Sequence, residues 1–311
     1  MEIKEEYIEF CKKEPIPIYS QYFYLDAVCG RDNWDVLLFK KGGEIFASFP
    51  FYKKKKAIFK GIAQPKLTQF LGPYIKYPKG QGSYKKLSWE KEIMDYFIKH
   101  LPKFDFFDIA FDYSITNWLP FYWQGFKQST KYTYIIKKDA NIDKLETNNR
   151  KRRRKKALKL GVEIIQSSNV EQFYKLNKLT FIRQQRDIAY DLEFIKNLYN
   201  KLNQHNAVKM LFAKYQNRII AANFLVEDKS CVYYLMGGIE PKYGDIGAMD
   251  LIQYESIKYA LLKGKSFDFE GSMVESIEKY FRSFGAIQKP YLEIKKINSK
   301  ILKLRECIKE F

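Results

Sequence analysis

Residues that cross-link chains or hold metals are scarce in this sequence. It has four cysteines, at positions 11, 29, 231 and 307, which form no CxxC pair, and two histidines, at positions 100 and 205. This scatter argues against a disulfide framework, a zinc site or a histidine-based metal centre. We therefore expect no metal cofactor, and we expect a cytoplasmic protein because a reducing compartment suits unpaired cysteines.

Long apolar runs are missing as well. The longest are strand-length segments such as residues 232–236, whereas a helix that crosses a bilayer needs about 20 apolar residues. The first six residues are acidic and polar, so we expect neither a signal peptide nor a membrane span. The 311 residues are 46% hydrophobic, which predicts a soluble globular protein with one large core or two modest ones.

Negative charge is in short supply. The formal net charge is +19, with seven consecutive basic residues at 150–156 and four more at 53–56. A positive field of this size attracts phosphates in nucleic acids, nucleotide-linked substrates, coenzyme A or an anionic membrane surface. Lysine-rich surfaces also serve solubility alone. The charge therefore does not choose among these partners, and peripheral contact with a membrane stays open.

What the sequence does contain is a repeat, because the end of the chain resembles its middle. Residues 107–109 read Phe-Asp-Ile and residues 267–269 read Phe-Asp-Phe. An aromatic turn that ends in glycine follows each, and the spacing from Asp108 to Gly125 equals the spacing from Asp268 to Gly285. The same strand, short helix and turn are therefore expected twice, which predicts two similar modules.

The segments before the repeat also match. A hairpin is expected at residues 36–49, with its turn at Gly42-Gly43, and a second hairpin at residues 209–224. Apolar residues at helical spacing predict a helix at 89–100 in the first half and at 248–263 in the second. Each helix leads into its Phe-Asp strand. Strands fed by helices in this order predict an α/β (α+β) fold, in which each module is a twisted mixed sheet flanked by helices.

The module boundaries follow from this order. A last strand is expected to close each half, at residues 132–136 and 291–294. A helix-favouring, basic segment lies between the halves and ends at a glycine. We therefore predict an N-terminal module at residues 1–142, a basic connector helix at 143–161, and a C-terminal module with a terminal helix at 162–311.

This order of elements resembles the GNAT acyltransferase fold. Two such modules joined by a basic helix resemble the FemABX-like aminoacyltransferases and the BioF2-like acetyltransferases. The segments that carry the resemblance are residues 149–157, 247–248, 267–272 and 281–285. The resemblance implies two tandem GNAT-like modules. Fem-type enzymes transfer an aminoacyl group from charged tRNA to an amine of a cell-wall precursor, and GNAT enzymes transfer an acyl group from acyl-CoA to an amine.

The resemblance also implies a phosphate-binding turn at the start of the central helix, where free N–H groups and the helix dipole favour anions. Lys242, Gly247 and Ala248 match the outer places of the pattern. Asp245 stands where the first glycine is expected, and its carboxylate would repel a phosphate. This departure disfavours the usual coenzyme A binding, and the turn is equally well explained as a helix start that Asp245 caps.

GNAT enzymes often place a tyrosine four residues before the closing glycine, as the acid for the leaving thiol. Phenylalanine occupies that place in both halves, at positions 121 and 281. We take Glu270 and Tyr243 as the catalytic candidates, because the first half has Ala110 where the second has Glu270. A capping or rim role for Glu270 remains the alternative. Gly271 and Ser272 follow it at the carboxyl end of a strand, where open α/β sheets bind ligands.

The remaining candidates are basic. Seven consecutive residues circle a helix, so the run at 150–156 cannot face a single ligand. In the resembling families this region lies beside the phosphates of the acceptor. Our candidates for phosphate contact are Arg150, Arg153, Arg154, Lys156 and Arg282, and the alternative for the run is a solvated helix.

The sequence thus predicts an acyl- or aminoacyltransferase that acts on an amine of a phosphate-bearing acceptor, such as an amino-sugar nucleotide or a cell-wall precursor. Its donor is either acyl-CoA or aminoacyl-tRNA, which makes tRNA a candidate partner. The alternative is a non-catalytic RNA-binding or scaffolding protein on a degenerate GNAT fold. The oligomeric state has no signature in the sequence.

Overall fold

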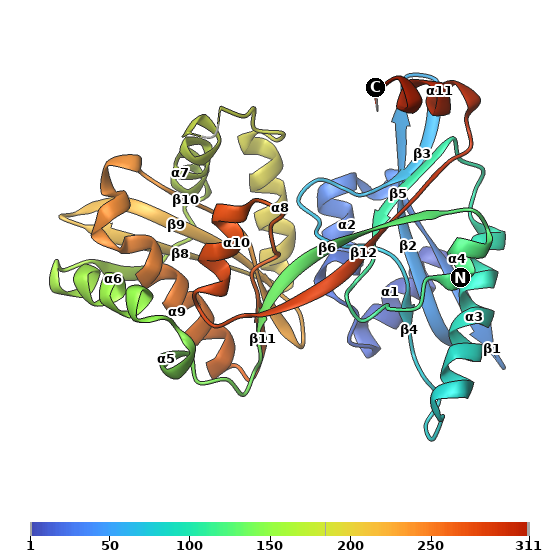
Figure 1. The fold of residues 1–311 in the computed structure, drawn as a ribbon, viewed down its shortest axis with the longest axis horizontal. Coiled ribbons are helices and arrows are strands. Elements are labelled where there is room, and N and C mark those ends of the chain that lie inside the picture. The colour runs from blue at the N-terminus through green and yellow to red at the C-terminus, as the bar shows by residue number, and fades with distance from the viewer. Residues whose placement is uncertain (1, 184, 310–311) are drawn as a thin grey trace. The chain divides into compact units, whose positions relative to one another are not determined.

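The computed structural model describes residues 2–183 and 185–309. The chain forms two compact units (Figure 1). The first consists of residues up to 131 together with residues from 290 onward, and the second consists of residues 132–289. None of the helices in the described part of the chain is both long and apolar enough to cross a membrane.

The first unit holds a mixed sheet with helices on both faces. Its strands run in the order β1-β2-β3-β5-β12, with β4 beside β2. β3 and β5 are parallel, and the other neighbours whose register is defined are antiparallel. The elements are α1 (Ile3–Lys13), α2 (Tyr22–Cys29), β1 (Trp34–Lys41), β2 (Glu44–Lys56), β3 (Phe59–Ala63), β4 (Tyr74–Ile75), α3 (Ser83–His100), β5 (Phe106–Ala110), α4 (Leu119–Trp123), β12 (Ile287–Ile297) and α11 (Lys300–Lys309).

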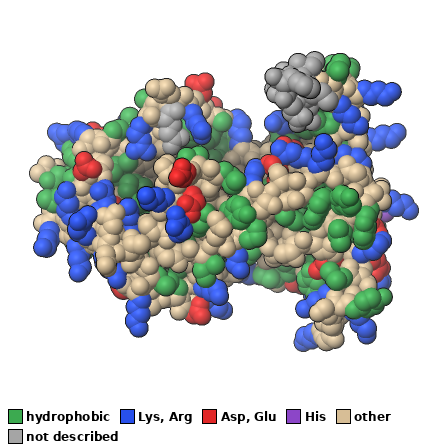
Figure 2. Space-filling model, viewed as in Figure 1, with side chains coloured by type: hydrophobic (Ala, Val, Ile, Leu, Met, Phe, Trp, Pro, Cys, Tyr) green, Lys and Arg blue, Asp and Glu red, His purple; other side chains and the backbone are tan. Residues whose placement is uncertain are grey.

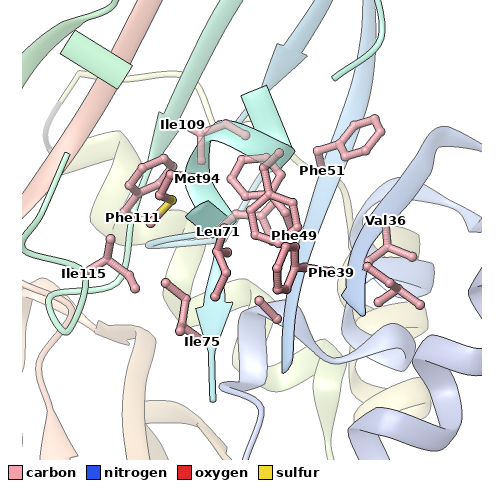
Figure 3. Close-up of a cluster of buried hydrophobic side chains, with 14 of the residues drawn as sticks. Val36, Phe39, Phe49, Phe51, Leu71, Ile75, Met94, Ile109, Phe111 and Ile115 are labelled. Carbon is pink, nitrogen blue, oxygen red and sulfur yellow. The ribbon is translucent and has the colours of Figure 1, made fainter. Parts of the chain in front are cut away.

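Aromatic side chains fill the core of this unit. Trp34 of β1 packs edge-on against Tyr7 of α1, and Phe39 packs edge-on against Trp89 of α3. Trp34 and Phe39 are an odd number of positions apart and so point to opposite faces of the strand. Figure 3 shows the cluster that gathers around Phe49, with side chains from strands, loops and α3. Burial on both faces explains the high aromatic content of this half.

The second unit has the sheet order β6-β11-β10-β9-β8-β7. β10 and β11 are parallel, and the other neighbours are antiparallel. The elements are the end of β6 (Lys127–Ile136), α5 (Ile142–Leu145), α6 (Asn148–Lys159), β7 (Glu163–Gln166), α7 (Val170–Arg183), α8 (Leu192–Gln204), β8 (Val208–Tyr215), β9 (Arg218–Glu227), β10 (Cys231–Ile239), the 3₁₀ turn η3 (Pro241–Ile246), α9 (Ala248–Leu262), β11 (Ser266–Asp268) and α10 (Glu275–Arg282).

Helices α9 and α7 cover opposite faces of this second sheet. Asn223 of β9 hydrogen-bonds to side chains of α9, and its neighbour Phe224 packs on Phe173 of α7. Successive residues of a strand point to opposite faces. The mixed α/β architecture predicted from the sequence is therefore confirmed, as are both hairpins and both central helices.

The last strand of each sequence half pairs in the other unit. Ile135 and Ile136 of β6 pair with β11 of the second unit, where the Thr133 hydroxyl also donates to buried Asp268. Residues 293–297 of β12 pair with β5 of the first unit. The sequence assigned both strands to their own halves. Because the two strands hold equivalent places in the repeat, the pattern cannot tell which sheet each one closes.

Candidate functional site

The sheet of the second unit splits where β10 and β11 part. These strands pair over three residues, and the last pair is Tyr233 with Asp268. β10 continues to Ile239. The segment that follows β11 turns away from it through Glu270 and Gly271, which have φ values of 62° and 66°. The carboxyl ends of two parallel strands thus diverge, and such ends are where open α/β sheets bind ligands.

Glu270 lies at this split and has an isolated carboxyl group. Its main-chain N–H donates to Asp268 Oδ1 at 2.7 Å. No group among the described residues hydrogen-bonds to Glu270 Oε1, which solvent does not reach. Burial raises the pKa of this carboxyl well above its usual range. A carboxyl group whose pKa lies closer to neutrality can exchange a proton at working pH, as general acid–base catalysis requires.

The neighbouring candidates have roles within the fold. Gly271 packs directly on the main-chain carbonyl of Tyr132, which leaves no room for a Cβ. The Ser272 hydroxyl accepts a hydrogen bond from the Val274 N–H at 3.0 Å. Arg282 is exposed and forms a 2.9 Å ion pair with Glu278, one turn earlier on α10. These contacts shape the turn after β11 and the surface of α10.

The turn before α9 is covered by α6. Gly247 has φ 85°, and its Cα packs on the main-chain carbonyl of Arg153, while Ala248 is buried as the first residue of α9. Arg153 Nη2 donates to the Gly244 carbonyl at 2.7 Å. Lys156 Nζ donates to the Asp245 carbonyl at 3.0 Å. Two cations of the basic run are therefore fixed on main-chain oxygens of this turn.

A buried carboxylate holds two arginines of the run. Asp250, in the first turn of α9, is 2% exposed. Its Oδ2 accepts from Arg153 Nε at 2.8 Å, and Arg150 pairs with Oδ1. The Arg150 guanidinium also lies over the ring of Tyr280. This network fastens α6 to the N-terminus of α9, where the helix dipole also favours a carboxylate.

Arg154 is held in the same way on the next face of α6. It pairs with Asp143 at 3.0 Å and with buried Glu146, and its guanidinium stacks over Tyr254. Lys and Arg side chains still gather over α6 on the face shown in Figure 2, since Arg152 and Lys155 are exposed. The sequence thus identified the basic helix, but Arg150, Arg153 and Arg154 bind acidic groups of the chain itself.

The structure does not bring Tyr243 to Glu270. The Tyr243 ring packs edge-on against Tyr215 of β8, and Lys242 forms a 2.8 Å ion pair with Glu240. In the sheet, β8 is three places from β11. At about 4.8 Å per strand, this separation is about 14 Å. The two residues that the sequence proposed for catalysis therefore belong to different parts of the unit.

Comparison with known proteins identifies the domain. Residues 146–281 match the model of the acetyltransferase (GNAT) domain family. The second unit carries a GNAT domain. This is a class of acyltransferases, so the chain carries an acyltransferase domain. No curated protein sequence matches the chain.

Solved structures extend the likeness to the whole chain. FemX matches with a TM-score of 0.70 and 15% identity over 97% of this chain and 98% of that chain. L-PGS from Bacillus licheniformis matches with a TM-score of 0.58 and 9% identity, over 96% and 94%. A tandem GNAT protein from the clavulanic acid biosynthesis pathway matches with a TM-score of 0.50 and 7% identity, over 86% and 83%. The tandem GNAT-like fold predicted from the sequence is confirmed.

In the GNAT domain, the covered turn is the place where the resemblance predicts the pyrophosphate of coenzyme A. A main-chain oxygen of α6 faces Gly247 there, and the buried Asp250 carboxylate lies one turn into the helix. The main chain of α6 thus already occupies the place over Gly247 that the pyrophosphate would need. The residues present therefore do not fit a coenzyme A pyrophosphate at this turn.

The sequence analysis missed a polar group inside the GNAT domain. Asn223, Gln253 and Ser256 are fully buried between β9 and α9, and Asn223 Nδ2 donates to both of the others. Tyr234 of β10 lies beside them, because a Cβ on Gly237 would meet both the Tyr234 hydroxyl and Asn223 Oδ1. The signal was present, since Asn223 is an amide inside an otherwise apolar strand.

Proposed function

We propose that the GNAT domain transfers an aminoacyl group from charged tRNA to an amine on a phosphate-bearing acceptor, such as an amino-sugar nucleotide or a cell-wall precursor. One observation carries the choice of donor. The strand split and Glu270 are present, but α6 covers the turn that would hold the pyrophosphate of acyl-CoA. A donor without that pyrophosphate has no such conflict.

The overall charge supports a nucleic-acid donor. A net charge of +19 attracts the phosphate backbone of tRNA, and exposed Arg152 and Lys155 add to it on α6. Lys53–Lys56, which are exposed at the end of β2, are a further cationic group. An aminoacyl-tRNA is therefore a donor that this surface favours before any contact with the reacting ester.

The chemistry requires little from the protein. The acceptor amine forms a bond to the ester carbonyl carbon, and the bond from that carbon to the ribose oxygen breaks. The amine loses one proton and the ribose oxygen gains one. In its ionised form, Glu270 takes the proton from the amine and can pass it to the leaving oxygen. Close placement of the two reactants in the split supplies the remainder of the acceleration.

Transfer assays test this function. Purified protein is incubated with an amino-sugar nucleotide or wall-precursor amine and, in parallel, with tRNA charged with labelled amino acids or with labelled acetyl-CoA. We expect label in the acceptor from charged tRNA, and we expect prior digestion of the tRNA with ribonuclease to abolish it. The variant Glu270→Gln should lower the rate by about 10²- to 10⁴-fold.

Other outcomes would redirect the proposal. Labelling from acetyl-CoA alone would overturn the tRNA donor. Salt-dependent tRNA binding without transfer to any amine would favour the non-catalytic RNA-binding or scaffolding alternative. Phe121 and Phe281 support that alternative, because neither side chain can donate a proton. No transfer and no tRNA binding would overturn both readings.

A further inference from the structure

Two unpaired groups face each other across Gly237 at the split between β10 and β11. Among the described residues, no group hydrogen-bonds to Asn223 Oδ1, although Asn223 is fully buried. The Tyr234 hydroxyl likewise has no partner there, and burial alone raises the pKa of this phenol. A buried polar atom without a partner is costly and rare, so Asn223 Oδ1 calls for an explanation.

Asn223 donates to two neighbours in α9. The Ser256 hydroxyl donates to the Ile252 carbonyl at 2.7 Å, so its oxygen is left to accept from Asn223 Nδ2 at 3.0 Å. Asn223 Nδ2 also donates to Gln253 Oε1 at 3.1 Å. Both Nδ2 hydrogens are used in these bonds, and the carbonyl oxygen of Asn223 points toward Gly237, where a Cβ would lie 2.9 Å from it.

The position of this pair suits the transferred group. Tyr234 directly follows Tyr233, the last residue of β10 that pairs with β11, and Glu270 comes two residues after Asp268, the partner of Tyr233. Tyr234 keeps part of its surface exposed, so a ligand in the split can reach it. The pair thus lies beside the end of the β10–β11 pairing, with Tyr234 on β10 and Asn223 on the neighbouring strand β9.

We propose that Asn223 Oδ1 and the Tyr234 hydroxyl bind the α-amino group of the aminoacyl group that is transferred. This inference rests on the proposed function. An amide oxygen can only accept, so the ligand must bring an N–H or O–H group. Both oxygens lie under 3.0 Å from the position that a Cβ of Gly237 would take. Two oxygens that accept from one tetrahedral nitrogen lie about 4.6 Å apart, which this geometry allows.

The size of Gly237 is part of the subsite. Any side chain there would collide with both oxygens. Glycine therefore lets both oxygens approach the strand at this point. An acetyl or other simple acyl group offers no hydrogen atom to this pair and would leave both oxygens unpaired, so the pair selects aminoacyl over acyl donors.

A matched pair of donors tests the subsite. Alanyl-tRNA and propionyl-tRNA differ only in the α-amino group, and kcat/KM is measured for both. We expect the wild type to prefer the amino ester by about tenfold or more. Tyr234→Phe, which keeps the ring, and Asn223→Ala should each remove most of this preference. Because the ratio compares two donors on one preparation, partial misfolding of a variant cancels.

Tyr233→Phe is the matched control. It removes a hydroxyl from the next residue of the same strand, where that hydroxyl donates to Asp228 at 2.9 Å, and it should leave the ratio unchanged. A purely structural role of Tyr234 would lower both rates alike. An active wild type without preference, or an unchanged ratio in Tyr234→Phe, would overturn the subsite alone. No turnover of either ester by the wild type would overturn the proposed function and the subsite together.

Discussion

Glu270 is a costly residue for the fold, and the proposed function gives it a chemical role. It adopts a left-handed backbone conformation, and solvent does not reach its unpartnered Oε1. A raised pKa means that the folded state favours the protonated carboxyl. Proteins keep such destabilising groups mainly where function needs them. This combination marks Glu270 more strongly than its place in the sequence pattern does.

Replacement of Glu270 by Gln should stabilise the protein, and more so at higher pH. Below the pKa of the unfolded glutamate, about 4.3, both states are protonated and the variant gains little. As the pH rises above that value, the unfolded state releases its proton and the folded state must retain it or bury a charge, so the wild type loses stability. Thermal unfolding of both proteins from pH 5 to pH 8 checks this. A Tm difference that shrinks with rising pH would contradict the raised pKa.

Asp250 is the opposite case, since it is a buried charge with two partners. Asp250→Asn should destabilise the second unit by about 3–5 kcal/mol, because Arg150 and Arg153 would lose their carboxylate. Denaturant unfolding measures this loss. Asp228→Asn is unsuitable as a control because Asp228 caps its own loop. Exposed Asp245 is suitable, because only its main-chain carbonyl is used, as the acceptor of a hydrogen bond from Lys156 Nζ. Asp245→Asn should therefore leave the stability almost unchanged.

Helix α6 has two different faces. Its inner face, with Arg150, Arg153 and Arg154, is fixed on acidic groups, and its outer face carries exposed Arg152 and Lys155. The inner face thus positions the helix over the turn before α9. Under the proposed function, the outer face contacts the phosphates of the tRNA.

Neutralising the two faces should separate stability from binding. The double variant Arg152→Gln/Lys155→Gln should weaken tRNA binding and lower the slope of log affinity against log salt by about one per removed contact, with Tm unchanged. Arg150→Gln/Arg153→Gln should instead lower Tm. Fluorescence anisotropy across a salt series gives the slopes. An equal effect of both double variants on binding would contradict the division between the faces.

The sequence was sufficient for the elements and insufficient for their partners. Periodicity and turn residues predicted the hairpins, α9 and the basic helix, because these are local properties. The ion pairs of α6 join residues such as Arg150 and Asp250 that are far apart in the chain, so spacing could not reveal them. One signal was available, since Asp250 is the only charged residue in the first two turns of α9. The isolated Asn223 in β9 was a similar signal.

At the scale of the whole molecule, the chain passes from one unit to the other and back. β6 carries it into the second unit and β12 carries it back to the first. Each unit therefore needs a strand from the other half of the sequence repeat. The predicted modules at 1–142 and 162–311 describe the repeat, whereas the compact units describe which segments pack together.

This exchange predicts which fragment can fold. A fragment of residues 132–289 holds every strand of the second sheet, and it keeps Thr133 beside Asp268. A fragment of residues 162–311 lacks the β6 partner of β11 and also lacks α6, so buried Asp250 would lose its arginines and Asp268 would lose Thr133. We expect the first fragment to show a cooperative thermal transition by circular dichroism and the second to show none. Cooperative unfolding of the 162–311 fragment would mean that β6 and α6 are dispensable, because the remaining strands would then close the sheet without them.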